Sequence, residues 1–282
     1  MGLFRINYNK PGPGVPKDLP RKKGAARFFE VLMRDFWDLI KLNMLFCLFV
    51  LPTVAAFFLG LLGFMPGIMF IVALFAAFPV GGAVVALMFN ITIFLRDDPS
   101  YVWNDFWRKF KQNYRSASAP GMLCTAFIYA QILMWTSLVV SEEGAFAFDA
   151  VWFFVAILVL VLFWMITPYI FMHYAYIDLK TPQIIKNSVL MSFAYIPRSF
   201  MGAIQGGVMW IIFALYFPIS LAYAPVIMIF GISVSFLLCL MWTWPPFEKY
   251  FGVEEALIKR SKSAAGEDDE EEEDSEEESE FK

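Results

Sequence analysis

The chain has 282 residues, of which 59% are hydrophobic and only 17% are charged, and its formal net charge is −4 at pH 7. A soluble domain of this length is about half apolar and about one quarter charged. The composition therefore excludes an ordinary soluble helical protein and predicts a chain embedded in a lipid bilayer.

The N-terminal segment, residues 1–26, is rich in Pro, Gly and basic residues. It contains no apolar run that ends in a small-residue cleavage site, so we expect no cleavable signal peptide. We predict that this segment is cytoplasmic and that a short helix over 28–37 approaches the first span. The membrane domain is expected to cover residues 27–250.

Four long stretches of the chain contain no Asp, Glu, Lys or Arg, namely 42–95, 116–141, 150–177 and 199–247. Because about 20 apolar residues cross a bilayer once, the first and last stretches are each long enough for two crossings. Turn-forming residues divide them near 60–67 and 218–225. We therefore predict an all-α six-helix transmembrane bundle, with spans at about 42–62, 67–95, 120–141, 149–177, 199–217 and 225–246.

All 22 Lys and Arg residues lie between or outside these spans on one side of the predicted topology. Nine lie in residues 1–41, five in 96–115, three in 180–198 and five from 249 onward. Since basic loops resist translocation, both termini are predicted to be cytoplasmic.

The linker between the second and third spans has an aromatic residue every three or four positions, which is typical of one face of a helix. We predict a cytoplasmic interfacial helix that places its rings among acyl chains and its cations near anionic headgroups. Docking of a partner protein is the alternative. The residues concerned are Trp103, Phe106, Trp107, Arg108, Lys109, Phe110, Lys111 and Arg115.

No phosphate-binding loop, zinc-peptidase motif, serine-hydrolase elbow or metal-spaced cysteine set occurs in the chain. We therefore expect no catalytic residue, no cofactor and no metal. Helix breaks at 79–82 and 167–168 could line a cavity, although packing of small residues is the more common reason for such a pattern. The candidates for these two roles, with the few polar residues of the spans, are Pro79, Gly81, Gly82, Asn90, Gln131, Thr167, Pro168, His173 and Gln205.

The C-terminal tail, residues 251–282, is expected to be cytoplasmic and disordered from about residue 264. Residues 267–280 contain twelve acidic residues, which repel one another. Contact of this tail with a basic partner surface is an alternative interpretation.

Several blocks of the membrane domain resemble the YesL-like family of bacterial membrane proteins, which share a domain of unknown function (624). The blocks are Phe36–Asn43 with Leu51–Pro52, Phe78–Pro79, Arg96–Asp98, Asp105–Phe106, Phe110–Asn113, Ile185–Ser188 and Ile196–Arg198. Members of this family are often encoded beside sugar-binding lipoproteins, ABC sugar permeases and glycoside hydrolases. The resemblance implies a role in carbohydrate uptake and does not define a mechanism.

These observations predict a non-enzymatic, multi-pass protein of the bacterial cytoplasmic membrane, an accessory or regulatory component of carbohydrate uptake. The expected partners are the lipid bilayer, ABC sugar-permease subunits and a second copy of the chain, with no nucleic acid. The alternative is a transporter or facilitator of a small neutral solute such as a sugar. A sugar site needs several hydrogen-bonding groups, and the predicted spans contain few.

Overall fold

A computed structural model describes residues 21–139, 150–215 and 222–259. Within these ranges the secondary structure is helical, with no strand. The predictions for residues 1–20 and for the acidic tail lie outside the described residues. The helices are α1 (Ala25–Arg34), α2 (Phe36–Leu61), α3 (Pro66–Ala76), α4 (Val80–Arg96), α5 (Val102–Asn113), α6 (Ser118–Val139), α7 (Ala150–Tyr176), α8 (Thr181–Ala194), α9 (Ile196–Leu215), α10 (Ala224–Val226), the π-helical turn η2 (Ile227–Gly231) and α11 (Ile232–Phe251).

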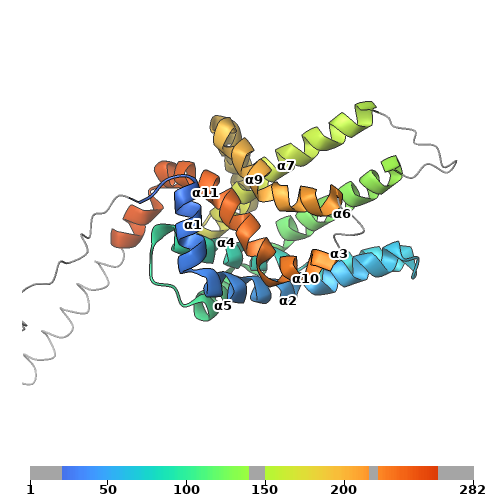
Figure 1. Cartoon of the computed structure of the whole chain (residues 1–282), viewed down its shortest axis with the longest axis horizontal. Coiled ribbons are helices and arrows are strands. Elements are labelled where there is room, and N and C mark those ends of the chain that lie inside the picture. The colour runs from blue at the N-terminus through green and yellow to red at the C-terminus, as the bar shows by residue number, and fades with distance from the viewer. Residues whose placement is uncertain (1–20, 140–149, 216–221, 260–282) are drawn as a thin grey trace, which may run out of the picture.

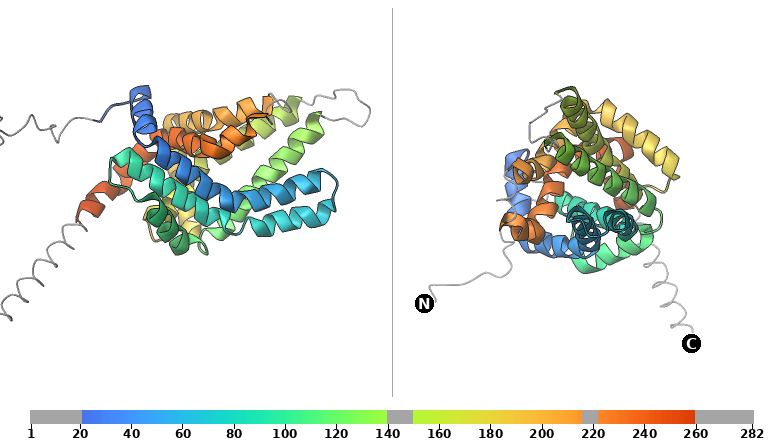
Figure 2. Two further views of the ribbon diagram at one scale, coloured as in Figure 1. Left: turned by 60° about the horizontal axis from the view of Figure 1, so that its bottom comes forward. Right: turned by 90° about the vertical axis from the view of Figure 1, so that its right-hand side faces the viewer.

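The long helices run roughly along the longest axis of the molecule. Helix α1 and the last turns of α11 lie at one end, and the turn between α2 and α3 lies at the other (Figures 1 and 2). The first helix and the end of the last one therefore meet on the same side of the bundle. This is the side to which the charge pattern assigns the basic segments.

Three helical segments are long and apolar enough to cross a membrane unaided: Phe36–Leu61, Phe154–Tyr176 and Ile227–Phe251. Two further pairs of helices satisfy the same criteria only if each pair is taken as one bent span. The first pair, α3 with α4, bends by 44°, and the second, α5 with α6, bends by 96°. Three to five membrane-crossing segments follow from the described residues, in agreement with a multi-pass membrane protein.

Helix α4 is the centre of the bundle, because its residues are buried along its whole length. It contacts α2, α5, α6, α7 and α11. A helix that is apolar on all sides is expected to be surrounded, either by lipid or by other helices. Here other helices of the same chain surround it.

Glycines allow the close approach of α4 to the segment that begins α6. A Cβ atom added to Gly81 would lie 1.9 Å from the carbonyl oxygen of Ala117, and one added to Gly121 would lie 2.4 Å from the Cα of Gly81. A Cβ on Gly82 would lie 2.7 Å from the Cα of Tyr114. The predicted helix break near Pro79 therefore coincides with a bend, and the two glycines after it pack against neighbouring backbone, as small residues do in membrane bundles.

Two boundaries differ from those expected from the sequence. Residues 181–194, expected to be part of a cytoplasmic linker, form helix α8, and α11 continues to Phe251 rather than ending near 246. The spans were predicted from runs without charged residues. Both of these segments contain charged residues on their exposed sides and were therefore not included. A helix that lies at the end of a bundle keeps such residues in water, so a charge does not end it.

Candidate functional site

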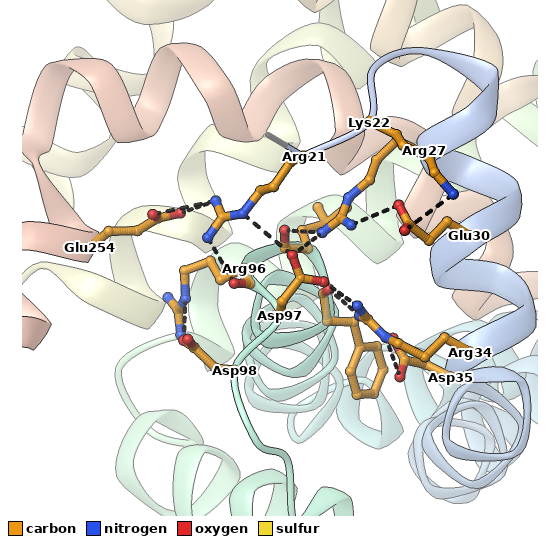
Figure 3. A network of polar contacts seen from close by, with 12 residues as sticks. Arg21, Lys22, Arg27, Glu30, Arg34, Asp35, Arg96, Asp97, Asp98 and Glu254 are labelled. Atoms are coloured by element: carbon orange, nitrogen blue, oxygen red, sulfur yellow. Dashed lines mark hydrogen bonds and ion pairs between the residues drawn. The ribbon is translucent and has the colours of Figure 1, made fainter. Parts of the chain in front are cut away.

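Arg21 and two arginines of α1, Arg27 and Arg34, cap the C-terminal end of α4 (Figure 3). Each guanidinium donates a hydrogen bond to one of the last three carbonyl oxygens of that helix. The pairs are Arg34 with Phe94 (2.7 Å), Arg27 with Leu95 (2.7 Å) and Arg21 with Arg96 (2.8 Å). The last carbonyls of a helix have no partner within it and carry partial negative charge, so cations there are favourable.

Asp97 lies at the centre of this network. Its backbone is left-handed, with φ of +65°, and it ends α4. Its carboxylate forms ion pairs with Arg27 at 2.7 Å, with Arg21 at 3.3 Å and with Arg34. Partial burial by itself raises the pKa of Asp97, but the hydrogen bonds from Arg27 and Arg34 outweigh it and hold that pKa below its ordinary value.

The network reaches beyond α1 and α4 to the C-terminal part of the described chain. Arg21 donates to the carboxylate of Glu254 at 3.0 Å, and Arg27 donates to Glu30 at 3.1 Å. The hydrogen bond from Arg27 holds the pKa of Glu30 below its ordinary value. Segments separated by more than 200 residues are thus joined at one end of the bundle. We name this set, Arg21, Arg27, Arg34, Asp97 and Glu254, the arginine clasp.

Arg96 points away from the clasp, into an aromatic site. Its guanidinium donates to Asp98 at 2.8 Å and to the hydroxyl of Tyr176 at 3.1 Å. It also lies 5.6 Å from the centroid of the Tyr176 ring and 5.7 Å from that of Trp244, within the range of cation–π attraction. This buried cation joins the ends of α4, α7 and α11.

The clasp was not among the sites predicted from the sequence. Arg27 and Arg34 are seven residues apart and so lie on one face of a helix, and Arg96–Asp98 directly follows an apolar run. These two patterns are the available signals. They do not indicate that the two segments meet, because the contacts join residues 60 or more positions apart.

Helix α5 packs part of its aromatic stripe, Phe106, Trp107 and Phe110, against Phe49 of α2. Phe106 is fully buried, and Phe49 of α2 stacks on Phe106 and Phe110 with ring centroids 6.1 and 4.4 Å away. Trp107 also contacts Phe49, at 5.9 Å. The predicted insertion of these rings into lipid is therefore wrong for Phe106. Periodicity identifies the residues that share a face but not what covers it.

The cations of α5 do not share one environment. The ammonium of Lys109 donates to the carbonyl oxygen of Ala175 at 2.8 Å and lies 4.6 Å from the centroid of the Phe89 ring, so Lys109 points into the bundle. Arg108 is exposed and pairs with Asp105 at 2.6 Å. Lys111 and Arg115 are exposed. Lys109 is therefore not part of the predicted cationic outer face. Its ammonium instead caps the last turn of α7.

The helix break predicted at 167–168 is wrong, because α7 is continuous from Ala150 to Tyr176 with Pro168 inside it. Thr167 and Pro168 line a cavity of about 10 Å³ between α4, α7, α9 and α11. A cavity of that size holds about one water molecule. The hydroxyl of Thr167 donates to the carbonyl oxygen of Phe163 at 2.7 Å. The polar candidates Asn90, Gln131 and Gln205 lie on three different helices and do not line this cavity.

Two of those three polar residues form local hydrogen bonds. The amide of Asn90 donates to the carbonyl oxygen of Ala86 at 2.8 Å. Gln205 accepts a hydrogen bond from the indole of Trp242 at 2.8 Å. Gln131 is buried, and its side-chain oxygen has no partner among the described residues. Asn90 therefore joins two turns of α4, Gln205 joins α9 to α11, and the three residues do not form one polar cluster.

His173 is fully buried at the end of α7. Its Nδ1 lies 2.7 Å from the carbonyl oxygen of Tyr169 and 3.2 Å from the hydroxyl of Ser188. The rings of Phe247 and Phe251 contact it edge to face, at 5.2 and 5.1 Å. Its position is that of a packing residue joining α7, α8 and α11.

Comparison of the chain with protein-family models, with curated proteins and with solved structures gave no match.

Proposed function

We propose that the chain is a six-span protein of the bacterial cytoplasmic membrane, with both termini in the cytoplasm, that acts through contact with another membrane protein. In this proposal it is a non-enzymatic accessory or regulatory component of carbohydrate uptake, and its partner is an ABC sugar permease. The carbohydrate part rests on the resemblance to the YesL-like family.

The six-span arrangement is supported by the apolar segments of the described chain. Three segments and two bent pairs meet the length and composition expected of a span. Helix α9 is the sixth candidate, with 20 residues of which only Arg198, near its start, is charged. Basic residues at the end of the bundle that holds the clasp favour a cytoplasmic position for that end.

One observation favours contact with a partner over passage of a solute. The cavity beside Thr167 and Pro168 has a volume of only about 10 Å³, whereas binding sites for small molecules are about 300–1,000 Å³. At the bend after Pro79, Gly81 packs directly on Ala117 and Gly121. A sugar has no room at either position in this conformation.

Two exposed aromatic residues offer a contact surface at the start of α5. Tyr101 is 77% exposed and Trp103 is 66% exposed, whereas the neighbouring Phe106 is fully buried. Large aromatic side chains are enriched at the centres of protein interfaces. Substitution of Tyr101 and Trp103 therefore tests the surface and leaves the buried stripe intact.

The test is crosslinking in membranes, followed by purification through a tag after Lys282 and identification of bound proteins by mass spectrometry. We expect sugar-permease subunits to be recovered, and Y101A/W103A to reduce their recovery about tenfold, the loss expected from one interface hot spot. W37A is the matched control, because Trp37 is 72% exposed and lies on α2. Recovery of only self-crosslinked chain would contradict the proposed partner.

A facilitator of a small neutral solute is the second candidate. The 44° bend between α3 and α4 favours it, because transporters use broken helices near their binding sites. Purified protein in liposomes that moves labelled sugar faster than empty liposomes would support this candidate and count against the accessory role.

A further inference from the structure

A groove of about 290 Å³ lies between α8 and the last turn of α11. Leu190 and Met191 line it from α8, and Tyr250 and Phe251 line it from α11. It is far larger than the cavity in the bundle interior, and it is close to the size of a small-molecule site. It shares no residue with the arginine clasp or with the exposed aromatics of α5.

The groove is at the end of the bundle where the last turn of α7 lies. Tyr174 of α7 donates a hydrogen bond to Thr181 at 2.9 Å, and Ser188 contacts His173, so α8 crosses that turn. Phe251 packs on the same His173. In the proposed topology, this level is the boundary between the acyl chains and the cytoplasm.

The surface around the groove combines apolar and polar side chains. Leu190 and Phe193 of α8 are 58% and 49% exposed, and they continue the apolar lining outward. Asn187 and Tyr195 line the groove as well and supply polar groups, and Tyr250 is 69% exposed. Tyrosine is enriched at membrane interfaces because its ring is apolar and its hydroxyl is polar.

Two cations stand beside this lining. Lys186 lies four residues before Leu190, so the two share one face of α8, and Lys249 precedes Tyr250 on α11. Both lysines are exposed and form no ion pair with the described residues. The acid next to Lys249, Glu248, accepts a hydrogen bond from the backbone N–H of Glu254 at 2.8 Å. The two lysines therefore place positive charge beside the apolar lining.

We propose that this groove binds an anionic phospholipid of the cytoplasmic leaflet, with an acyl chain along Leu190, Met191 and Phe251 and a phosphate headgroup near Lys186 and Lys249. Basic pockets between helices on the cytoplasmic side are a known mode of lipid headgroup binding. The combination of a long apolar wall with two cations fits a lipid better than a free anion, which needs no apolar wall. This site does not depend on the proposed partner.

The test is native mass spectrometry of the full chain, delipidated in neutral detergent, with phosphatidylglycerol and phosphatidylcholine that carry the same acyl chains. We expect phosphatidylglycerol to bind at least about fivefold more tightly. K186A and K249A should each weaken its binding about fivefold, the amount expected for one basic residue near an anionic surface. K23A is the matched control, because Lys23 is exposed and distant in sequence from both groove helices.

Three results would overturn the proposal. They are equal binding of the two lipids, unchanged binding by K186A/K249A, and displacement of the lipid by inorganic phosphate, which would indicate a free-anion site. A194W, which places an indole in the groove, should reduce binding of both lipids. The two lysine variants change only exposed side chains and should therefore fold. They test binding of the lipid headgroup even where A194W does not fold.

Discussion

Among single residues, Asp97 has the largest number of charged partners in the arginine clasp. It holds three guanidinium groups that also cap the final carbonyls of α4. The negative charge of Asp97 lies between three cations and offsets their mutual repulsion. The backbone at this position is left-handed, a conformation that Asp and Asn adopt more readily than most residues. Asn at this position keeps the backbone preference and removes only the charge.

D97N should therefore lower the free energy of unfolding by about 1–2 kcal/mol. Removal of one partner from a buried ion pair costs about 3–5 kcal/mol, and the partial exposure of Asp97 reduces that cost. The measurement is thermal or denaturant unfolding of the purified protein in detergent. D38N is the matched control, because Asp38 forms an exposed pair with Lys41 whose loss costs only a few tenths of a kcal/mol.

The pH dependence gives a second measure of the same substitution. The pKa of Asp97 is lowered in the folded protein, so its contribution to stability is present above the ordinary pKa of about 4 and is lost as pH falls through the folded pKa. The difference in stability between wild type and D97N should be constant from pH 5 to pH 8 and decrease below about pH 4. A difference that changes near neutral pH would contradict this assignment.

At the level of helices, the predictable features are those set by composition along the chain. Charge-free runs locate the apolar helices, and the Pro79 region marks the bend between α3 and α4. The partner of each face was not predictable: the aromatic stripe of α5 contacts Phe49, and Lys109 caps α7. Lipid and protein present the same apolar surface to a helix, so hydrophobicity does not distinguish them.

Polar contacts across the bundle were harder still to predict. Gln205 and Trp242 form a hydrogen bond between α9 and α11, and Asn43 of α2 accepts one from the backbone N–H of Ser233 at 2.8 Å. A single polar residue in an apolar run indicates that some partner exists. It does not identify the helix that provides that partner, since each span has several possible neighbours.

The crossing of α4 and the start of α6 depends on the absence of a side chain at Gly81. G81A should destabilise the protein by about 1–3 kcal/mol or more, because its Cβ would lie 1.9 Å from the Ala117 carbonyl oxygen and would force the segments apart. G207A is the matched control: Gly207 is in α9, and no atom lies within 4 Å of its Cβ position. Alanine favours a helix over glycine, so G207A should be neutral or slightly stabilising. Equal thermal stability of the two variants would contradict the close packing of α4.

For the whole molecule, the proposed topology makes opposite ends of the bundle accessible from opposite sides of the membrane. Phe64, in the turn between α2 and α3, is 59% exposed, and Trp103, at the start of α5, is 66% exposed. In a background with Cys47, Cys124 and Cys239 replaced by alanine, F64C should react with a membrane-impermeant maleimide in spheroplasts with an intact membrane. W103C should react only after permeabilisation, because the proposed topology, which follows the basic residues, places its end of the bundle in the cytoplasm.

Labelling of both cysteines after permeabilisation is the control for their exposure in the folded protein. Reaction of W103C alone in intact spheroplasts would reverse the orientation and place the arginine clasp outside the cell. That outcome is unfavourable in energy, since Arg21, Arg27 and Arg34 would have to cross the membrane during insertion, at about 2.5–3.5 kcal/mol for each at the centre of the bilayer. The same three arginines that cap α4 in the folded protein therefore also favour retention of its end on the cytoplasmic side.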